Sequence, residues 1–129
     1  MTIAQKISDC LLGAFVADAA SMGVEWIYDP SQMKETVESL ETPEFKNPPS
    51  PQYFSSKEFL GHYGPGMLSP YGEQMLWVAE YFAKKGYDGT KDDMFASMKE
   101  WAKSFGGRPD HALTTAIGQG KGADDDQGT

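Results

Sequence analysis

The sequence predicts an all-α domain, and three features of the chain support this prediction. Apolar residues recur three and four residues apart in several segments. No segment alternates apolar and polar residues over the length of a strand. Helix-capping residues, prolines and glycines mark where the periodic segments begin and end. The chain has 129 residues, of which 40% are hydrophobic and 23% charged, and this composition is typical of one globular domain.

The first predicted helix covers residues 2–22 and begins at Thr2, whose side chain can cap it. Its apolar stripe consists of Ile3, Ile7, Leu11, Phe15 and Met22. Asp18 falls on the same stripe, three residues after Phe15 and four before Met22. Cys10, the only cysteine, is interpreted as a small core residue. The helix is therefore predicted to bury one apolar face with a carboxylate on it.

A carboxylate on a buried face needs a partner, because an isolated charge in the interior costs several kcal/mol. Asp18 is expected to cap a neighbouring helix, to bond a Tyr or Trp side chain, to lose its charge, or to bind a cation. The residues alone favour the cap or the hydrogen bond.

A second helix is predicted to begin after Asp29, the capping residue, with Pro30 in its first turn and Gln32 at the reciprocal capping position. Its buried face is expected to comprise Met33, Val37 and Leu40. The following residues, 41–70, hold six of the eight prolines and are interpreted as a long ordered loop. The aromatic residues of this loop are Phe45, Tyr53, Phe54, Phe59 and Tyr63.

Three further helices are predicted in the second half of the chain. The third covers residues 70–85, with Ser69 as its cap, and its inward residues are Met75, Leu76, Ala79 and Phe82. The fourth follows a capping pair of Thr90 and Asp93, and its apolar stripe comprises Met94, Phe95, Met98, Trp101, Ala102 and Phe105. The fifth covers residues 109–117 and its apolar residues are Ala112, Leu113, Ala116 and Ile117.

The charge of the chain restricts its partners. A formal net charge of −8 repels nucleic acid and anionic membrane surfaces, so neither is expected as a partner. No uninterrupted apolar run approaches the roughly 18 residues that a membrane span needs. The single cysteine suits a reducing cytoplasm, which is the predicted location.

Three groups of acids are candidates for chemistry. Glu25 follows the first helix, where the turn can direct it into a cleft, or it is an ordinary exposed glutamate. Glu73 stands in the first turn of the third helix, where an acid also complements the helix dipole. The run Asp124 to Asp126 can bind a hard cation such as Mg²⁺, or it forms a solvated acidic tail.

Two stretches resemble the ADP-ribosylglycohydrolase superfamily. "LLGAFVADAASMGVEWIYDP" is similar to the opening of these proteins, in which a Gly-Asp-Ala segment on the first helix is followed by a Glu. Ala17, Asp18 and Ala19 with Glu25 match that spacing, with Ala17 in place of the usual Gly. "HYGPGMLSPYGEQM" falls where the family begins its metal-binding helix, and "GKGADDDQG" is similar to a glycine-rich polar stretch of the family.

The resemblance implies an orthogonal all-α domain that hydrolyses a glycosidic bond of ADP-ribose with the help of Mg²⁺. It implies a catalytic role for Glu25 and an ADP-ribose or ADP-ribosylated substrate. The substrate-binding residues that it implies are Asp18, Tyr71 and Gly122, and the metal-binding residues are Glu73, Asp124 and Asp125.

The chain departs from the family pattern at the metal helix. The family carries Thr-Asp-Asp where this chain has Tyr71, Gly72 and Glu73, so one of the two acids is retained. These variants resemble a branch that includes jellyfish J-type crystallins, which makes a non-catalytic, crystallin-like structural protein the alternative function. Residues 1–129 are expected to form the N-terminal portion of one truncated domain, whose exposed helix faces favour self-association.

Overall fold

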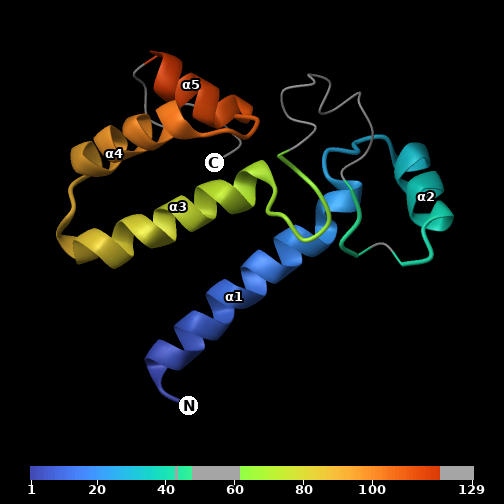
Figure 1. The fold of residues 1–129 in the computed structure, drawn as a ribbon, viewed down its shortest axis with the longest axis horizontal. Coiled ribbons are helices and arrows are strands. Elements are labelled where there is room, and N and C mark those ends of the chain that lie inside the picture. The colour runs from blue at the N-terminus through green and yellow to red at the C-terminus, as the bar shows by residue number, and fades with distance from the viewer. Residues whose placement is uncertain (43, 48–61, 120–129) are drawn as a thin grey trace. The chain divides into compact units, whose positions relative to one another are not determined.

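The computed structural model describes residues 1–42, 44–47 and 62–119, apart from the side chains of Tyr87 and Gln119 (Figure 1). Its contacts divide the chain into two compact units, Met1–Gly72 and Glu73–Thr129. Five α-helices and two short 3₁₀ helices make up the regular structure of the described residues, which contain no strand. The prediction of an all-α fold is therefore confirmed.

Helix α1 (Ile3–Ser21) begins where the sequence predicts, and a 3₁₀ turn, η1 (Met22–Val24), follows it. The Thr2 hydroxyl accepts a hydrogen bond from the Gln5 N–H at 3.2 Å and so caps the first turn. The predicted burial of the apolar stripe is wrong for the first half of the helix. Ile3 is 78% exposed and Ile7 is 54% exposed, and Cys10 is exposed rather than part of a core.

The core of the first unit forms at the other end of α1. Met22 has no exposed surface, Tyr63 is buried beside it, and Trp26 packs against this pair. The Phe45 N–H donates to the Ala20 carbonyl at 3.0 Å, which satisfies a carbonyl in the last turn of the helix. The loop therefore returns to the C-terminal end of α1 and leaves the N-terminal half without cover from the described residues.

One segment, Ile3–Val24, is long and apolar enough to cross a membrane by length and composition, with a mean hydropathy of 1.4. The predicted absence of such a segment is therefore wrong, because counting uninterrupted apolar residues overlooks a helix with few, dispersed charges. Core helices of soluble proteins and N-terminal signal sequences meet the same criteria. The finding by itself assigns no membrane location.

Helix α2 (Pro30–Ser39) is capped as predicted, because Asp29 Oδ1 accepts a hydrogen bond from the Gln32 N–H at 2.7 Å. The predicted buried face is wrong, since α2 contains no buried residue and Val37 is exposed. Of the predicted aromatic loop residues, Tyr53, Phe54 and Phe59 lie outside the described residues.

Helix α3 (Pro70–Lys85) has the predicted bounds, and the 3₁₀ helix η2 (Gly86–Asp88) follows it. Helix α4 (Lys91–Ser104) begins with the predicted capping box, in which Thr90 and Asp93 each bond the backbone N–H of the other. Helix α5 (His111–Gln119) begins two residues later than predicted, because Asp110 supplies its cap. Asp110 Oδ1 accepts from the Leu113 N–H at 2.7 Å.

The buried hydrophobic residues of the second unit come from α3 and α5. On α3 they are Trp77 and Tyr81, whereas Leu76, which was predicted to face inward, is exposed. On α5 they are Ala112, Leu113 and Ala116, three of the four apolar residues that the sequence places on this helix. Trp77 and Tyr81 therefore occupy the core of the second unit, whereas Leu76 does not.

Candidate functional site at the start of helix α3

Asp18 lies in the last turn of α1 and is half-buried. Its carboxylate accepts two hydrogen bonds from Ser69: Oδ2 accepts from the backbone N–H at 2.7 Å, and Oδ1 accepts from the hydroxyl at 2.6 Å. Hydrogen bonds to an ionised acceptor are roughly twice as strong as neutral ones. The partner predicted for Asp18 therefore exists, and it is the start of a neighbouring helix.

Ser69 connects Asp18 to α3. It has no exposed surface, and its Oγ accepts hydrogen bonds from the backbone N–H groups of Tyr71 and Gly72, both at 3.2 Å. These N–H groups lie in the first turn, where a helix supplies no acceptor of its own. The prediction that Ser69 caps α3 is confirmed. Its hydroxyl donates once and accepts twice, which is its full hydrogen-bonding capacity.

Gly72 lies directly against the Asp18 carboxylate. A Cβ atom added to Gly72 would overlap Asp18 Oδ2, and it would lie 2.6 Å from Cγ. Only glycine fits this position while the carboxylate is in place. We call Asp18, Ser69 and Gly72 together the Asp18 cap.

Trp26 and Tyr71 form an aromatic pair beside the Asp18 cap. The Trp26 Nε1–H donates to Tyr71 Oη at 3.1 Å, and the two rings meet edge to face with centroids 6.3 Å apart. Trp26 has a φ of 59°, in the left-handed region that bulky residues rarely adopt. No pattern in the sequence marks Trp26 as a site residue, because its partner Tyr71 lies 45 residues further along the chain.

Glu25 precedes this pair and is half-buried. Burial raises the pKa of its carboxyl, and the nearby negative charge of Asp18 raises it further. A carboxyl with a raised pKa keeps its proton at higher pH than an ordinary glutamate does. The structure thus brings Asp18, Glu25 and Tyr71, three of the predicted site residues, into one unit together with Trp26.

The predicted metal residues are not brought together in the described part of the chain. Glu73 lies in the first turn of α3, as expected, whereas Gly122, Asp124 and Asp125 lie outside the described residues. Among the described residues, no three His, Cys, Asp or Glu side chains are grouped so that they could hold a metal ion. Glu73 is therefore the predicted metal-binding residue that the structure describes.

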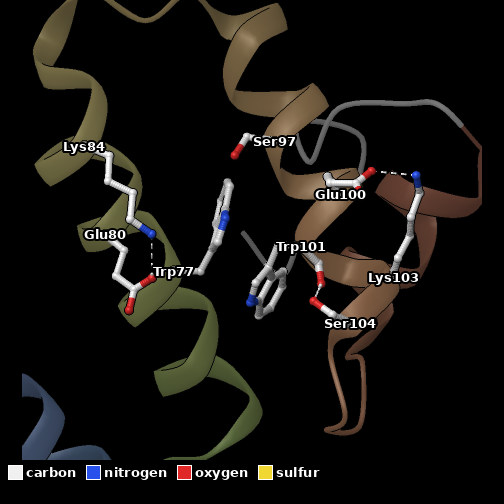
Figure 2. A pocket seen from close by; sticks show the side chains of 8 residues that line it. All are labelled: Trp77, Glu80, Lys84, Ser97, Glu100, Trp101, Lys103 and Ser104. Carbon is white, nitrogen blue, oxygen red and sulfur yellow. Dashed lines mark hydrogen bonds and ion pairs between the residues drawn. The ribbon is translucent and has the colours of Figure 1, made fainter.

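A separate cavity of about 410 Å³ lies in the second unit (Figure 2). Trp77 and Trp101 stack there with ring centroids 5.7 Å apart. Charged side chains on its edge are paired along their own helices, Lys84 with Glu80 at 3.4 Å and Lys103 with Glu100 at 2.6 Å. None of the predicted site residues lines this cavity.

The family model described as ADP-ribosylglycohydrolase matches residues 1–128, and the chain therefore belongs to this family.

Two relatives of this chain are crystallins of Tripedalia cystophora. Crystallin J1B is 26% identical, with an alignment that covers 98% of this chain and 42% of the relative. Crystallin J1A is 27% identical, over 92% of this chain and 39% of the relative. The chain thus spans about two-fifths of the length of these relatives. No solved structure matches it.

Proposed function

We propose that this chain binds an ADP-ribose group and promotes hydrolysis of its glycosidic bond, with Glu25 as the proton-exchanging residue. The observation that carries the proposal is the half-buried Glu25 carboxyl, whose pKa is raised by burial and by the charge of Asp18. Membership of the ADP-ribosylglycohydrolase family supports the choice of ligand.

The chemistry of the proposal requires only a carboxyl group and water. Cleavage of a glycosidic bond is easier when the leaving atom receives a proton, and a carboxylic acid with a raised pKa retains one to donate. In the proposal Glu25 donates this proton to the leaving atom, water adds to the ribose carbon as the bond breaks, and the proton that the water loses returns to the Glu25 carboxylate. The edge-to-face pair of Trp26 and Tyr71 offers aromatic surface and the Tyr71 hydroxyl beside the ligand.

Magnesium has no step in this proposal. The described residues include no group of three His, Cys, Asp or Glu side chains that could hold a metal ion. A magnesium site that includes Glu73, Asp124 and Asp125 stays a prediction, because the last two residues lie outside the described part.

The experiment combines calorimetric titration of ADP-ribose with hydrolysis assays on N-linked and O-linked ADP-ribosylated peptides. We expect Glu25→Gln to lower the hydrolysis rate by about 100-fold or more, the usual contribution of a general acid, with little change in ADP-ribose affinity. Glu35→Gln is the matched control, because Glu35 is an exposed glutamate on α2. Equal rates for the two variants would refute the role of Glu25.

A second candidate function is a non-catalytic, crystallin-like structural role. The relatives named crystallin J1B and J1A favour it. It predicts that the wild-type chain neither binds ADP-ribose nor hydrolyses any of the peptides, and that it stays soluble at high protein concentration because of its net charge of −8.

A further inference from the structure

We infer that Trp26 is a positioning residue for Glu25, and that it acts through the hydrogen bond from its indole to the Tyr71 hydroxyl. That Trp26 holds Glu25 in place rests on the geometry of the first unit alone. The benefit of this placement for proton donation rests on the proposed function. Three features of the first unit support the inference.

The segment that carries Glu25 is tied on both sides to the same short stretch at the start of α3. Before Glu25, the Asp18 carboxylate accepts two hydrogen bonds from Ser69, at 2.7 and 2.6 Å. After Glu25, the Trp26 Nε1–H donates to Tyr71 Oη at 3.1 Å. Glu25 therefore lies between two anchored residues, and its distance from Asp18 depends on both anchors.

The backbone of Trp26 has a conformation that needs support from its surroundings. Its φ of 59° lies in the left-handed region, which is unfavourable for a bulky residue. Such a conformation persists where contacts of the folded chain enforce it. For Trp26 these contacts are its packing against Met22 and Tyr63 and its edge-to-face meeting with the Tyr71 ring. Loss of one contact should let Trp26 relax, and Glu25 should move with it.

The turn around Glu25 has only long hydrogen bonds of its own. Glu25 follows η1 and has an extended backbone, so no helix fixes its direction. Its N–H donates to the Met22 carbonyl at 3.2 Å, and the Ile27 N–H donates to the Val24 carbonyl at 3.4 Å. These lengths lie at or beyond the upper end of the usual range for N–H···O bonds. The bond of Trp26 adds a restraint that the turn itself supplies weakly.

Loss of this restraint has a measurable consequence for the Glu25 carboxyl. Burial and the charge of Asp18 raise its pKa. Both effects weaken when the carboxyl moves toward water and away from Asp18. The pKa of Glu25 should therefore fall when the Trp26 N–H or the Tyr71 hydroxyl is removed. A residue that only stabilised the fold would leave this pKa unchanged in the folded chain.

The first test measures the pKa of Glu25 by carbon-13 NMR titration of its carboxyl, with Glu25→Gln to assign the signal. We expect Trp26→Phe and Tyr71→Phe each to lower this pKa, because each keeps a ring and removes one partner of the hydrogen bond. The double variant should lower it no further, since all three variants lack the same bond. If Trp26→Phe does not fold, Tyr71→Phe decides alone, because Tyr71 is 45% exposed. An unchanged pKa in the folded single variants, or additive shifts in the double variant, would overturn the inference.

Two control variants make the same chemical changes away from this hydrogen bond. Tyr28→Phe removes the hydroxyl of a side chain that is 77% exposed. Trp101→Phe removes an indole of the second unit, which stacks on Trp77 with ring centroids 5.7 Å apart, and should lower the urea unfolding midpoint. Neither control should change the pKa of Glu25. A fall of this pKa in either control would indicate a general loosening of the fold and contradict a specific role of Trp26.

The second test separates the inference from the proposed function. A general acid must hold its proton, so hydrolysis of ADP-ribosylated peptides should decline as the pH rises through the pKa of Glu25. We expect this decline to occur at lower pH in Trp26→Phe than in the wild-type chain. The maximal rate should fall by up to about 100-fold, the effect that a displacement of about 1 Å can have.

The outcomes of the second test distinguish the two claims. An unmoved pH dependence in Trp26→Phe would overturn the benefit for proton donation. A wild-type chain without hydrolysis would refute the proposed function, and the NMR pKa values would then decide whether Trp26 holds Glu25 in place.

Discussion

Asp18 illustrates how a single charged side chain can join two elements that are distant in the sequence. It lies on α1, and its two hydrogen bonds reach Ser69, which is 51 residues further along the chain. The carboxylate avoids the cost of an unpaired charge because two donors surround it. Ser69 in turn satisfies two N–H groups of α3. The Asp18 cap therefore fixes where α3 begins.

The stability of the first unit should depend strongly on Asp18. We expect Asp18→Ala to lower the free energy of unfolding by about 2–4 kcal/mol, because two charge-assisted hydrogen bonds are lost and the Ser69 donors are left unpaired. The measurement is urea unfolding followed by circular dichroism. Asp9→Ala is the control on the exposed part of the same helix, and it should change the unfolding free energy by less than about 0.5 kcal/mol. Equal effects of the two substitutions would contradict the Asp18 cap.

Glu25 should reduce stability at neutral pH. Its pKa is raised in the folded chain, so the folded state holds its proton at pH values where the unfolded state has released it. Stability therefore falls as the pH rises from the unfolded pKa to the folded pKa, and the loss persists at higher pH. We expect Glu25→Gln to raise the urea midpoint relative to wild type at about pH 7 and to have little such effect at about pH 4, near the unfolded value.

A pH series of urea midpoints for wild type and Glu25→Gln measures this difference. Glu35→Gln, on the exposed part of α2, controls for the general loss of one negative charge. A constant difference between Glu25→Gln and wild type across the series would show that Glu25 has no raised pKa.

At the scale of elements, the second unit repeats the use of a buried acid at a helix start. Asp110 is 8% exposed. Its Oδ1 accepts from the Leu113 N–H at 2.7 Å, and its Oδ2 accepts from the Gln74 side chain at 2.8 Å. One carboxylate thus caps α5 and connects it to α3 at the same time.

Loss of this carboxylate should weaken the connection between α3 and α5. We expect Asp110→Ala to lower the free energy of unfolding by about 2–3 kcal/mol, the sum of a lost helix cap and a lost buried hydrogen bond. The double variant with Gln74→Ala measures the connection separately, through the coupling between the two substitutions in thermal unfolding. Strictly additive effects would show that the bond between Gln74 and Asp110 does not stabilise the fold.

At the scale of the whole molecule, the exposed apolar surface of α1 is the feature with the clearest consequence in solution. Apolar residues project on more than one side of the helix, since Ile7 is 54% exposed and Leu12 is 62% exposed. Only 17% of its most apolar window is buried. A helix that is apolar on most sides is stable in water only when other surfaces cover it.

We therefore expect the chain to self-associate through α1. Sedimentation velocity over a wide range of protein concentration should show a rising mean mass. Ile7→Lys combined with Leu12→Lys should shift the chain toward the monomer, because the new charges resist burial. Val37→Lys replaces an exposed apolar residue on α2 and should leave association unchanged. A monomer at all concentrations would rule out association through this face.

The sequence predicted local structure well and burial less well. The bounds of α3 and the caps at Thr2, Asp29, Ser69 and Thr90 depend on residues within a few positions of each other, and all of them are confirmed. Periodicity placed Ile3, Ile7 and Leu11 on one stripe but could not reveal what covers it. None of the described residues covers this stripe, and the three side chains are exposed.

The candidate site shows the same division between what is local and what is not. By itself, the sequence determined the helices, their caps and the need of Asp18 for a partner, because these follow from propensity, spacing and the cost of an unpaired charge. Only the tertiary structure decided that the partner is Ser69, that Gly72 lies against the Asp18 carboxylate, and that Trp26 meets Tyr71. These contacts join residues that are separated by 45 to 54 positions in the sequence. They form when the loop returns to α1, and no local pattern encodes them.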